Sequence, residues 1–246
     1  MRPEIEAKLL NLNKKFYAAF AEQFVQTRTS PQPGFANLLN YLPIPCRSVI
    51  DVGCGNGRFG AFLTSHLEGF SYTGVDFTES FLQIAGNSLE GEFIARDISR
   101  PGFLEGLGKY DLAVCLAALQ HIPGESNRLA VLQEMADHLA LHGMIFLSNW
   151  QFLHSDRQRR KILDWGEIGL RPADLDPNDY LLSWQRSGHG RRYVHLVDEQ
   201  EISRLAEDAS LVIIDEYRSD GREGDLNLYT ILAKQGVDTK SANATI

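Results

Sequence analysis

The first part of the chain has apolar side chains on one face if it is drawn as a helix. They recur at three- and four-residue steps from Ile5 to Phe24, which is the spacing of an amphipathic helix. The pattern predicts a helix over residues 3–26. A proline-rich break and a shorter helix over residues 35–42 follow. We expect residues 1–45 to form a helical cap.

The middle of the chain alternates short β-branched runs with longer helical patterns. Strands are predicted at residues 48–52, 72–75, 92–95, 110–116 and 144–147, and helices at 58–67, 79–87 and 127–141. The last helix is predicted to end at His142-Gly143. Strands that alternate with helices in this way form parallel βαβ units with right-handed crossovers.

The alternation stops over residues 149–195, a stretch that holds every tryptophan of the chain and eight Lys or Arg against six acids. We expect an insertion or lid there. A helix at 199–208 and strands at 211–216 and 227–233 then resume the pattern. A hairpin-type loop joins the last two strands, so the final strand should run antiparallel.

These elements predict an α/β, Rossmann-like, doubly wound sheet of about seven strands. It should be mostly parallel, with a reversed last strand and helices on both faces. Residues 1–246 would form a single domain, and the small, polar tail at 234–246 would be flexible.

Composition narrows the class of protein. The 246 residues are 43% hydrophobic and 23% charged, as in ordinary globular domains. The net charge of −8 argues against a chain-wide nucleic-acid surface but not against a local basic patch. Three cysteines without a CxxC pair suggest reduced thiols and a cytoplasmic protein. We expect no metal site, and no membrane segment because no apolar run nears ~20 residues.

The sharpest motif is Asp51-Val-Gly53-Cys54-Gly55-Asn-Gly57, which follows a predicted strand and opens a helix. A dinucleotide-binding loop would need glycine where Arg58 stands. A carboxylate at position 51 suits an ammonium group better than phosphates. The motif therefore points to S-adenosylmethionine, which carries an ammonium group and no phosphate.

Two further acids follow the next strands. Asp76 ends the second strand, about 20 residues after the glycines, where it could accept both ribose hydroxyls. Asp97 follows the third strand, beside Ile98, where it could accept the adenine amino group. Ligands of open α/β sheets bind at this carboxyl edge. The alternative is a glycine turn with scattered surface acids.

Residues 48–148 resemble the class I S-adenosylmethionine-dependent methyltransferases. The resemblance implies that the glycine loop holds the cofactor, Asp76 the ribose, and Asp97 with Ile98 the adenine. We expect these residues at the cofactor: Asp51, Gly53, Cys54, Gly55, Gly57, Asp76, Phe77, Asp97, Ile98 and Leu116.

A narrower resemblance covers most of the chain. The matching motifs are Phe24-Val-Gln-Thr-Arg28 with Pro31 and Pro33, Gly74-Val-Asp76-Phe77, Leu119-Gln-His121, Leu182-Ser-Trp184 and Arg192-Tyr193-Val-His195. They are similar to motifs of the tRNA wobble-uridine methyltransferases, which esterify a carboxymethyl group on the first anticodon base. The chain has Gln120-His121 where that family often has His-His, and Pro31-Gln-Pro33 where it has Pro-Trp-Pro.

Methyl transfer from a sulfonium is an in-line displacement, so the enzyme mainly aligns the reactants. A carboxylate acceptor is ionised at pH 7 and needs a cationic clamp rather than a base. Arg28 and Arg192 are the candidates, and exposed surface arginines are the alternative. His121 could orient the acceptor or act as a base, or it could be a plain hydrogen-bonded histidine.

Three residues of the insertion are candidates for substrate binding. Trp184 and Tyr193 could stack on a flat substrate, with His195 beside them. Aromatic side chains in an insertion also build its core.

Modified tRNA uridine is the leading candidate for the methyl acceptor. The alternatives are a small-molecule acceptor covered by the 149–195 lid, and a non-catalytic cofactor-binding subunit. Some family members need an activating partner protein.

Overall fold

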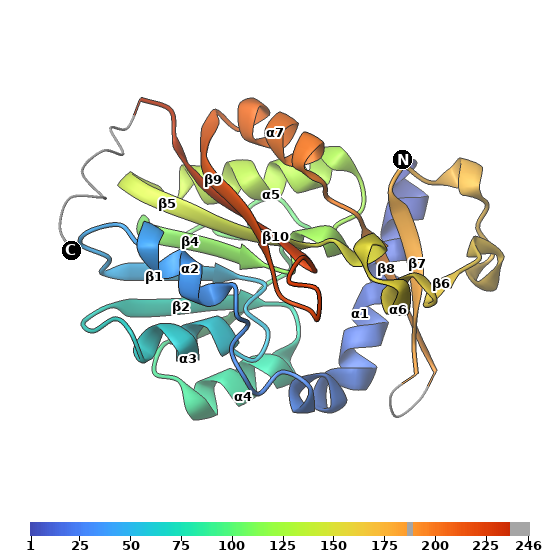
Figure 1. Cartoon of the computed structure of the whole chain (residues 1–246), viewed down its shortest axis with the longest axis horizontal. Helices are drawn as coiled ribbons and strands as arrows, with labels where there is room; N and C mark the ends of the chain where they lie inside the picture. The colour runs from blue at the N-terminus through green and yellow to red at the C-terminus, as the bar shows by residue number, and fades with distance from the viewer. Residues whose placement is uncertain (186–188, 237–246) are drawn as a thin grey trace.

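The computed structural model describes residues 1–185 and 189–236 (Figure 1). Its main sheet has the order β3-β2-β1-β4-β5-β10-β9. The strands are β1 Ser48–Val52, β2 Ser71–Asp76, β3 Glu92–Ala95, β4 Tyr110–Leu116, β5 Leu139–Trp150, β9 Leu211–Ser219 and β10 Asn227–Lys234. Strand β10 runs antiparallel to β5 and β9, and the other neighbouring strands of this sheet pair in parallel. The predicted sheet with a reversed last strand is confirmed. Most of the predicted flexible tail, from residue 237 on, lies outside the described residues.

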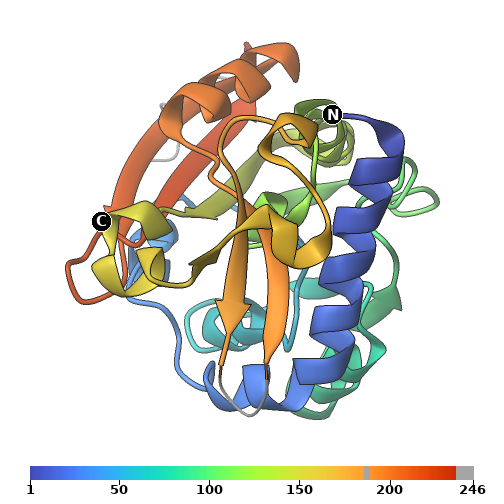
Figure 2. The same ribbon diagram turned by 90° about the vertical axis from the view of Figure 1, so that its right-hand side faces the viewer.

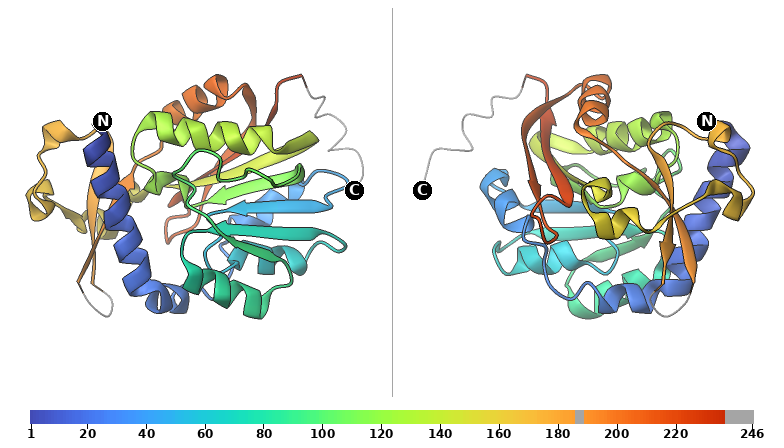
Figure 3. Two further views of the ribbon diagram at one scale, coloured as in Figure 1. Left: turned by 180° about the vertical axis from the view of Figure 1, so that it is seen from behind. Right: turned by 45° about the vertical axis from the view of Figure 1, so that its right-hand side comes forward.

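Helices cover both faces of the sheet (Figures 1 and 3). They are α2 Phe35–Leu38, α3 Arg58–Thr64, α4 Glu79–Ser88, α5 Glu125–Asp137 and α7 Glu199–Asp208, with the 3₁₀ turn η1 Leu39–Tyr41. Helix α1 Pro3–Gln26 instead lies across the carboxyl edge of the sheet, and the 3₁₀ turn η2 Leu119–His121 follows β4. Side chains alternate along a strand. Ile50 therefore packs towards α5 and α7, whereas Val49 packs towards α2 and α3. Each face of the sheet has its own apolar core.

One predicted helix is too long. The expected helix at 127–141 ends at Asp137 as α5, and Leu139 already belongs to β5, where it pairs with Tyr110. Gly143 lies inside the strand, where a Cβ atom would come within 2.9 Å of the Tyr110 carbonyl oxygen. The glycine therefore permits close strand packing rather than ending a helix, because sheet pairing overrides the apolar spacing.

The 149–195 stretch forms a small antiparallel sheet of β6 Ile162–Leu163, β7 Asp179–Trp184 and β8 Gly190–His195. The short helical segments η3 Phe152–His154 and α6 Asp156–Arg159 precede β6, and η4 Trp165–Ile168 and η5 Pro172–Asp174 connect β6 to β7. Figure 2 shows this sheet beside α1. The side chain of Asn13 joins the two, because it donates to the Tyr193 carbonyl at 3.1 Å and accepts from its N–H at 2.8 Å.

Among the helices of the described residues, none has the length and apolar character that crossing a membrane requires.

Candidate active site

A cavity lies where the parallel strands end, between the main sheet, α1 and β8. The predicted residues that line it are Arg28, Asp51, Gly53, Cys54, Gly55, Asp76, Phe77, Asp97, Ile98, Leu116, His121 and Arg192. They come from the segment just after α1, from the carboxyl ends of β1 to β4 with the loops that follow, and from β8. The fold therefore brings the predicted cofactor residues and the three candidate catalytic residues into one space.

The glycine loop forms the floor of this cavity. Gly55 has φ +54°, and a Cβ atom placed there would meet no protein atom within 4 Å, so it would project into the open cavity. The Gly55 N–H donates to Asp76 at 3.0 Å. Gly57 does not line the cavity. A Cβ atom on it would lie 3.0 Å from that of Ala85 on α4, so glycine at this position allows close packing of the loop against that helix.

The three acids stand at neighbouring strand ends, in different environments. Asp51 is buried and accepts from the Tyr72 hydroxyl at 2.7 Å, and burial raises its pKa to about 7. Asp76 is buried and accepts backbone N–H groups, and burial raises its pKa.

Asp97 differs because a cation from the helical cap reaches it. Lys14 of α1 lies 2.5 Å from Asp97 Oδ2, and the Ser99 hydroxyl donates to Oδ1 at 2.6 Å. Burial raises the pKa of Asp97, but the hydrogen bonds from Lys14 and Ser99 outweigh it and lower the pKa.

His121 is held as a neutral ring. Its Nδ1 lies 3.2 Å from the Tyr193 carbonyl oxygen, which can only accept, so Nδ1 carries the hydrogen. Its Nε2 therefore accepts from the Tyr17 hydroxyl at 2.8 Å. Burial, reinforced by the charge of Arg192, lowers the pKa of His121 to about 3. The lone pair that a general base would use is engaged by Tyr17.

Arg192 is a buried cation among aromatic rings. Its side chain is 2% exposed. The guanidinium carbon lies 4.7 Å from the ring centre of Trp150 and 5.4 Å from that of Phe16. Its guanidinium interacts with the Tyr17 hydroxyl, but no carboxylate of the described residues forms an ion pair with it, and its Nε has no hydrogen-bond partner. A buried guanidinium in this state favours a bound anion. Arg28 lines the same cavity with its guanidinium 3.3 Å from the Phe24 ring centre.

The three predicted substrate-binding residues do not line the cavity. Alternation along β8 turns Tyr193 and His195 to the face opposite Arg192. Tyr193 is fully buried and donates to Asp179 at 2.7 Å. His195 lies 2.7 Å from both Asp179 and Glu201. Neither side chain therefore reaches the cavity in which we predicted it to meet the substrate.

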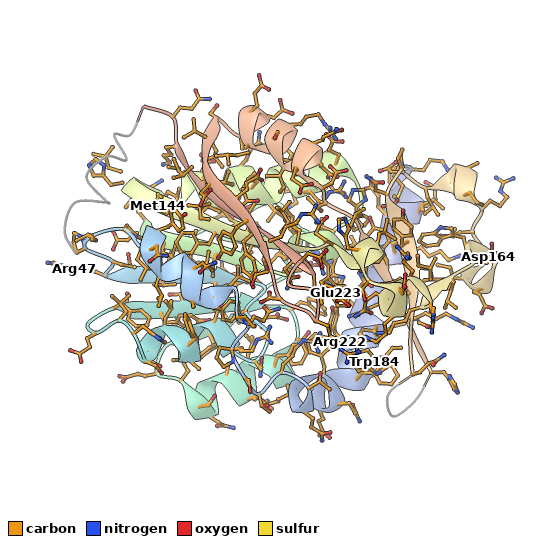
Figure 4. The ribbon with its side chains drawn as sticks, in the orientation of Figure 1. Arg47, Met144, Asp164, Trp184, Arg222 and Glu223 are labelled. Atoms are coloured by element: carbon orange, nitrogen blue, oxygen red, sulfur yellow. The ribbon has the colours of Figure 1, made fainter. Side chains whose placement is uncertain are left out.

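Trp184, labelled in Figure 4, packs against Phe16 and Phe24 of α1. It is 8% exposed, and its ring centre lies 5.8 Å from the Arg192 guanidinium carbon. The tryptophan thus belongs to the core that surrounds Arg192 rather than offering a free face for stacking.

Sequence reasoning missed Lys14, Tyr17, Trp150 and Asn227, which also line the cavity. Lys14 and Tyr17 lie on a helix that was interpreted only through its apolar face. Asn227 begins β10, opposite Trp150 at the end of β5. The first residue of a reversed last strand must lie at the carboxyl edge of its parallel neighbours, and this rule could have identified it.

A family model described as "Methyltransferase domain" matches residues 50–145. The fold is also shared with solved enzymes. An S-adenosylmethionine-dependent methyltransferase from Clostridium acetobutylicum aligns with a TM-score of 0.61 at 15% identity, covering 91% of this chain and 99% of that one. An amino pentose methyltransferase from Micromonospora echinaspora, solved with bound S-adenosylmethionine, aligns with a TM-score of 0.60 at 14% identity, covering 87% and 96%.

Fold, glycine cradle and acids together fit S-adenosylmethionine, and the chain is a class I S-adenosylmethionine-dependent methyltransferase. It is similar to the tRNA (carboxymethyluridine(34)-5-O)-methyltransferases of Arabidopsis thaliana and Schizosaccharomyces pombe. The first is 27% identical over 60% of this chain and 34% of its own length, so this chain spans only about a third of it. The second is 25% identical over 81% and 88%. A ubiquinone biosynthesis O-methyltransferase of Rickettsia prowazekii is 26% identical over 71% and 62%.

Proposed function

We propose that this methyltransferase esterifies a carboxylate, and that the acceptor is the carboxymethyl group of a modified uridine in tRNA. The observation that carries the proposal is Arg192, a buried cation that lines the cavity without an acidic partner among the described residues. A carboxylate from the acceptor would supply the missing charge in the planar geometry that a guanidinium prefers.

The state of His121 also favours a carboxylate over a phenol or hydroxyl acceptor. An alcohol must lose a proton as it attacks, and a nearby base usually removes it. Here Nε2 of His121 is occupied by Tyr17, and burial keeps the pKa of the ring near 3. A carboxylate attacks through an oxygen that is already ionised. No base is then required.

Each residue at the cavity has a separate role in the proposed reaction. Asp51 would face the ammonium group of the cofactor, Asp76 the ribose and Asp97 the adenine. S-adenosylmethionine supplies an electrophilic methyl group on sulfur. Attack of the carboxylate oxygen on that carbon would break its bond to sulfur, and the products would be a methyl ester and S-adenosylhomocysteine. Arg192 and Arg28 would hold the carboxylate in line.

The choice of tRNA is supported by the names of the two similar enzymes and by the motifs of this chain that resemble those of the wobble-uridine methyltransferases. A small carboxylate covered by the same 149–195 lid is the competing acceptor. An activating partner protein, as some relatives use, is part of the proposal. The assay must therefore supply one.

The test supplies labelled S-adenosylmethionine and three anticodon stem-loops, which carry uridine, 5-carboxymethyluridine or its uncharged carboxamide at the first anticodon position. We expect transfer to the carboxylate alone. Arg192→Gln should lower kcat/KM at least tenfold, because a charged hydrogen bond is lost. The assay is run with the purified chain and again with added extract of the source cells. Transfer to a metabolite fraction but to no stem-loop would overturn the choice of tRNA.

A further inference from the structure

We propose that Asn227 recognises a ring N–H of the acceptor and so restricts this enzyme to uracil rather than cytosine bases. This inference rests on the proposed function and names a specificity residue for the same site.

The orientation of the Asn227 amide is fixed by its surroundings. The residue is fully buried, and its Nδ2 donates to Asp220 Oδ2 at 2.7 Å. The same oxygen accepts from the Tyr229 hydroxyl at 2.6 Å, and Oδ1 of Asp220 accepts from the Gly34 N–H at 2.8 Å. A carboxylate accepts only, so the NH₂ end must face Asp220.

This arrangement leaves the amide oxygen without a partner. Oδ1 of Asn227 is buried and makes no hydrogen bond, and Asn227 lines the cavity. Buried acceptors are nearly always satisfied in folded proteins, because an unpaired one is costly. The amide therefore offers one acceptor, in a fixed direction, to a donor on a bound molecule.

Asn227 and Arg192 belong to one wall of the cavity. Asn227 is the direct antiparallel partner of Trp150, and partners of this kind carry their side chains on the same face of the sheet. The guanidinium carbon of Arg192 lies 4.7 Å from the Trp150 ring centre. A cation, an aromatic ring and an acceptor thus follow one another along the wall.

A 5-carboxymethyluracil has complementary groups along one edge. Its carboxylate, the O4 acceptor and the N3–H donor follow one another around the ring. The carboxylate would pair with Arg192 and N3–H would donate to Asn227. In cytosine N3 carries a lone pair instead of a hydrogen. The lone pair of cytosine N3 would then face the amide oxygen of Asn227, and neither can donate a hydrogen bond. Sites built around a hydrogen bond reject such analogues strongly.

The experiment compares three stem-loops that carry 5-carboxymethyluridine, its N3-methyl derivative or 5-carboxymethylcytidine at the same position. We expect the wild-type protein to use the first at least tenfold better, by kcat/KM, than either of the others. Asn227→Ala should bring the uridine and cytidine substrates to within about threefold, because the opposing acceptor is gone. Cofactor affinity, measured by calorimetry, should stay unchanged.

Asn149→Ala is the matched control. Asn149 is a fully buried amide on β5 with no side-chain hydrogen bond, but it does not line the cavity. This variant should keep the wild-type preference. If the wild-type protein uses all three substrates equally, or if Asn227→Ala keeps the wild-type ratio, the inference is overturned while the proposed function stands. If the wild-type protein methylates none of them, both fall.

Discussion

Tyr17 and His121 join the helical cap to the catalytic edge of the sheet through a hydrogen bond of 2.8 Å. The two residues are 104 positions apart in the sequence. Asn13, one helical turn before Tyr17, donates to the carbonyls of both His121 and Tyr193. One face of α1 therefore holds η2 and β8 together and forms one wall of the cavity.

We predict that this pair is energetically coupled. Tyr17→Phe leaves Nε2 of His121 buried without a donor, which should lower the free energy of unfolding by about 1–3 kcal/mol. His121→Phe leaves the Tyr17 hydroxyl unsatisfied at a similar cost. The double variant removes both polar groups, so its loss should be clearly smaller than the sum. Urea denaturation measures all three, and strictly additive losses would contradict the coupling.

The raised pKa of Asp51 predicts a pH dependence of cofactor binding. Burial brings this pKa to about 7, and only the ionised carboxyl attracts the ammonium group. Below pH 7 the carboxyl must first release its proton, so affinity should fall as the pH decreases, approaching tenfold per pH unit. Above pH 7 the affinity should level off.

Calorimetry in two buffers with different ionisation enthalpies would detect the released proton near pH 7. Asp51→Asn keeps the shape of the side chain and removes its titration. Its weaker affinity should be independent of pH across this range. A wild-type affinity that does not change between pH 6 and pH 8 would show that Asp51 does not face the ammonium group.

The sequence predicted the parts of the site that depend on local pattern. Asp51 and Asp76 lie at the carboxyl ends of β1 and β2, and Asp97 follows β3. Parallel strands end at one edge, so three short patterns placed these acids on one cavity. Tyr193 and His195 do not line that cavity, because strand alternation sends the members of their motif to opposite faces.

Other parts of the site depend on contacts between distant segments. Tyr17 meets His121, and Asn227 meets Trp150, only after the sheet and the cap have assembled. Periodicity identifies which face of a helix is apolar, but it does not tell which polar residue at the border of that face will line a cavity. The end of α5 was missed for a similar reason, since Leu139 continues the apolar spacing of the helix but pairs in the sheet.

Two of the three glycines of the cofactor loop provide a matched comparison. Gly55 and Gly57 both have positive φ, at +54° and +73°, so alanine at either position should cost about 1 kcal/mol of stability. The new methyl group of Gly55→Ala projects into the cavity, whereas that of Gly57→Ala contacts α4. We expect only Gly55→Ala to weaken cofactor binding, by at least tenfold. Calorimetry on both folded variants tests this, and equal affinities would remove Gly55 from the site.

The ion pair between Lys14 and Asp97 should control how fast the cofactor binds and leaves. Lys14 Nζ of α1 lies 2.5 Å from Oδ2 of Asp97 after β3. Asp97 is also the carboxylate that we expect to meet the adenine. Lys14→Met keeps the length of the side chain and removes the charge. The cap should then open more often, so association and dissociation should both accelerate several-fold while the equilibrium affinity changes less than threefold.

Salt gives an independent check on the same contact. Lys14 is 37% exposed, so salt should screen the pair. High salt should accelerate cofactor exchange in the wild-type protein more than in Lys14→Met, in which only the exposed Arg100 still pairs with Asp97, at 3.3 Å. Stopped-flow tryptophan fluorescence would measure both. Asp97→Ala should behave differently, because it also removes the adenine acceptor, and its affinity should fall tenfold or more. If both variants lost affinity equally with unchanged association rates, Lys14 would bind the cofactor directly. It would then not act by holding the helical cap closed.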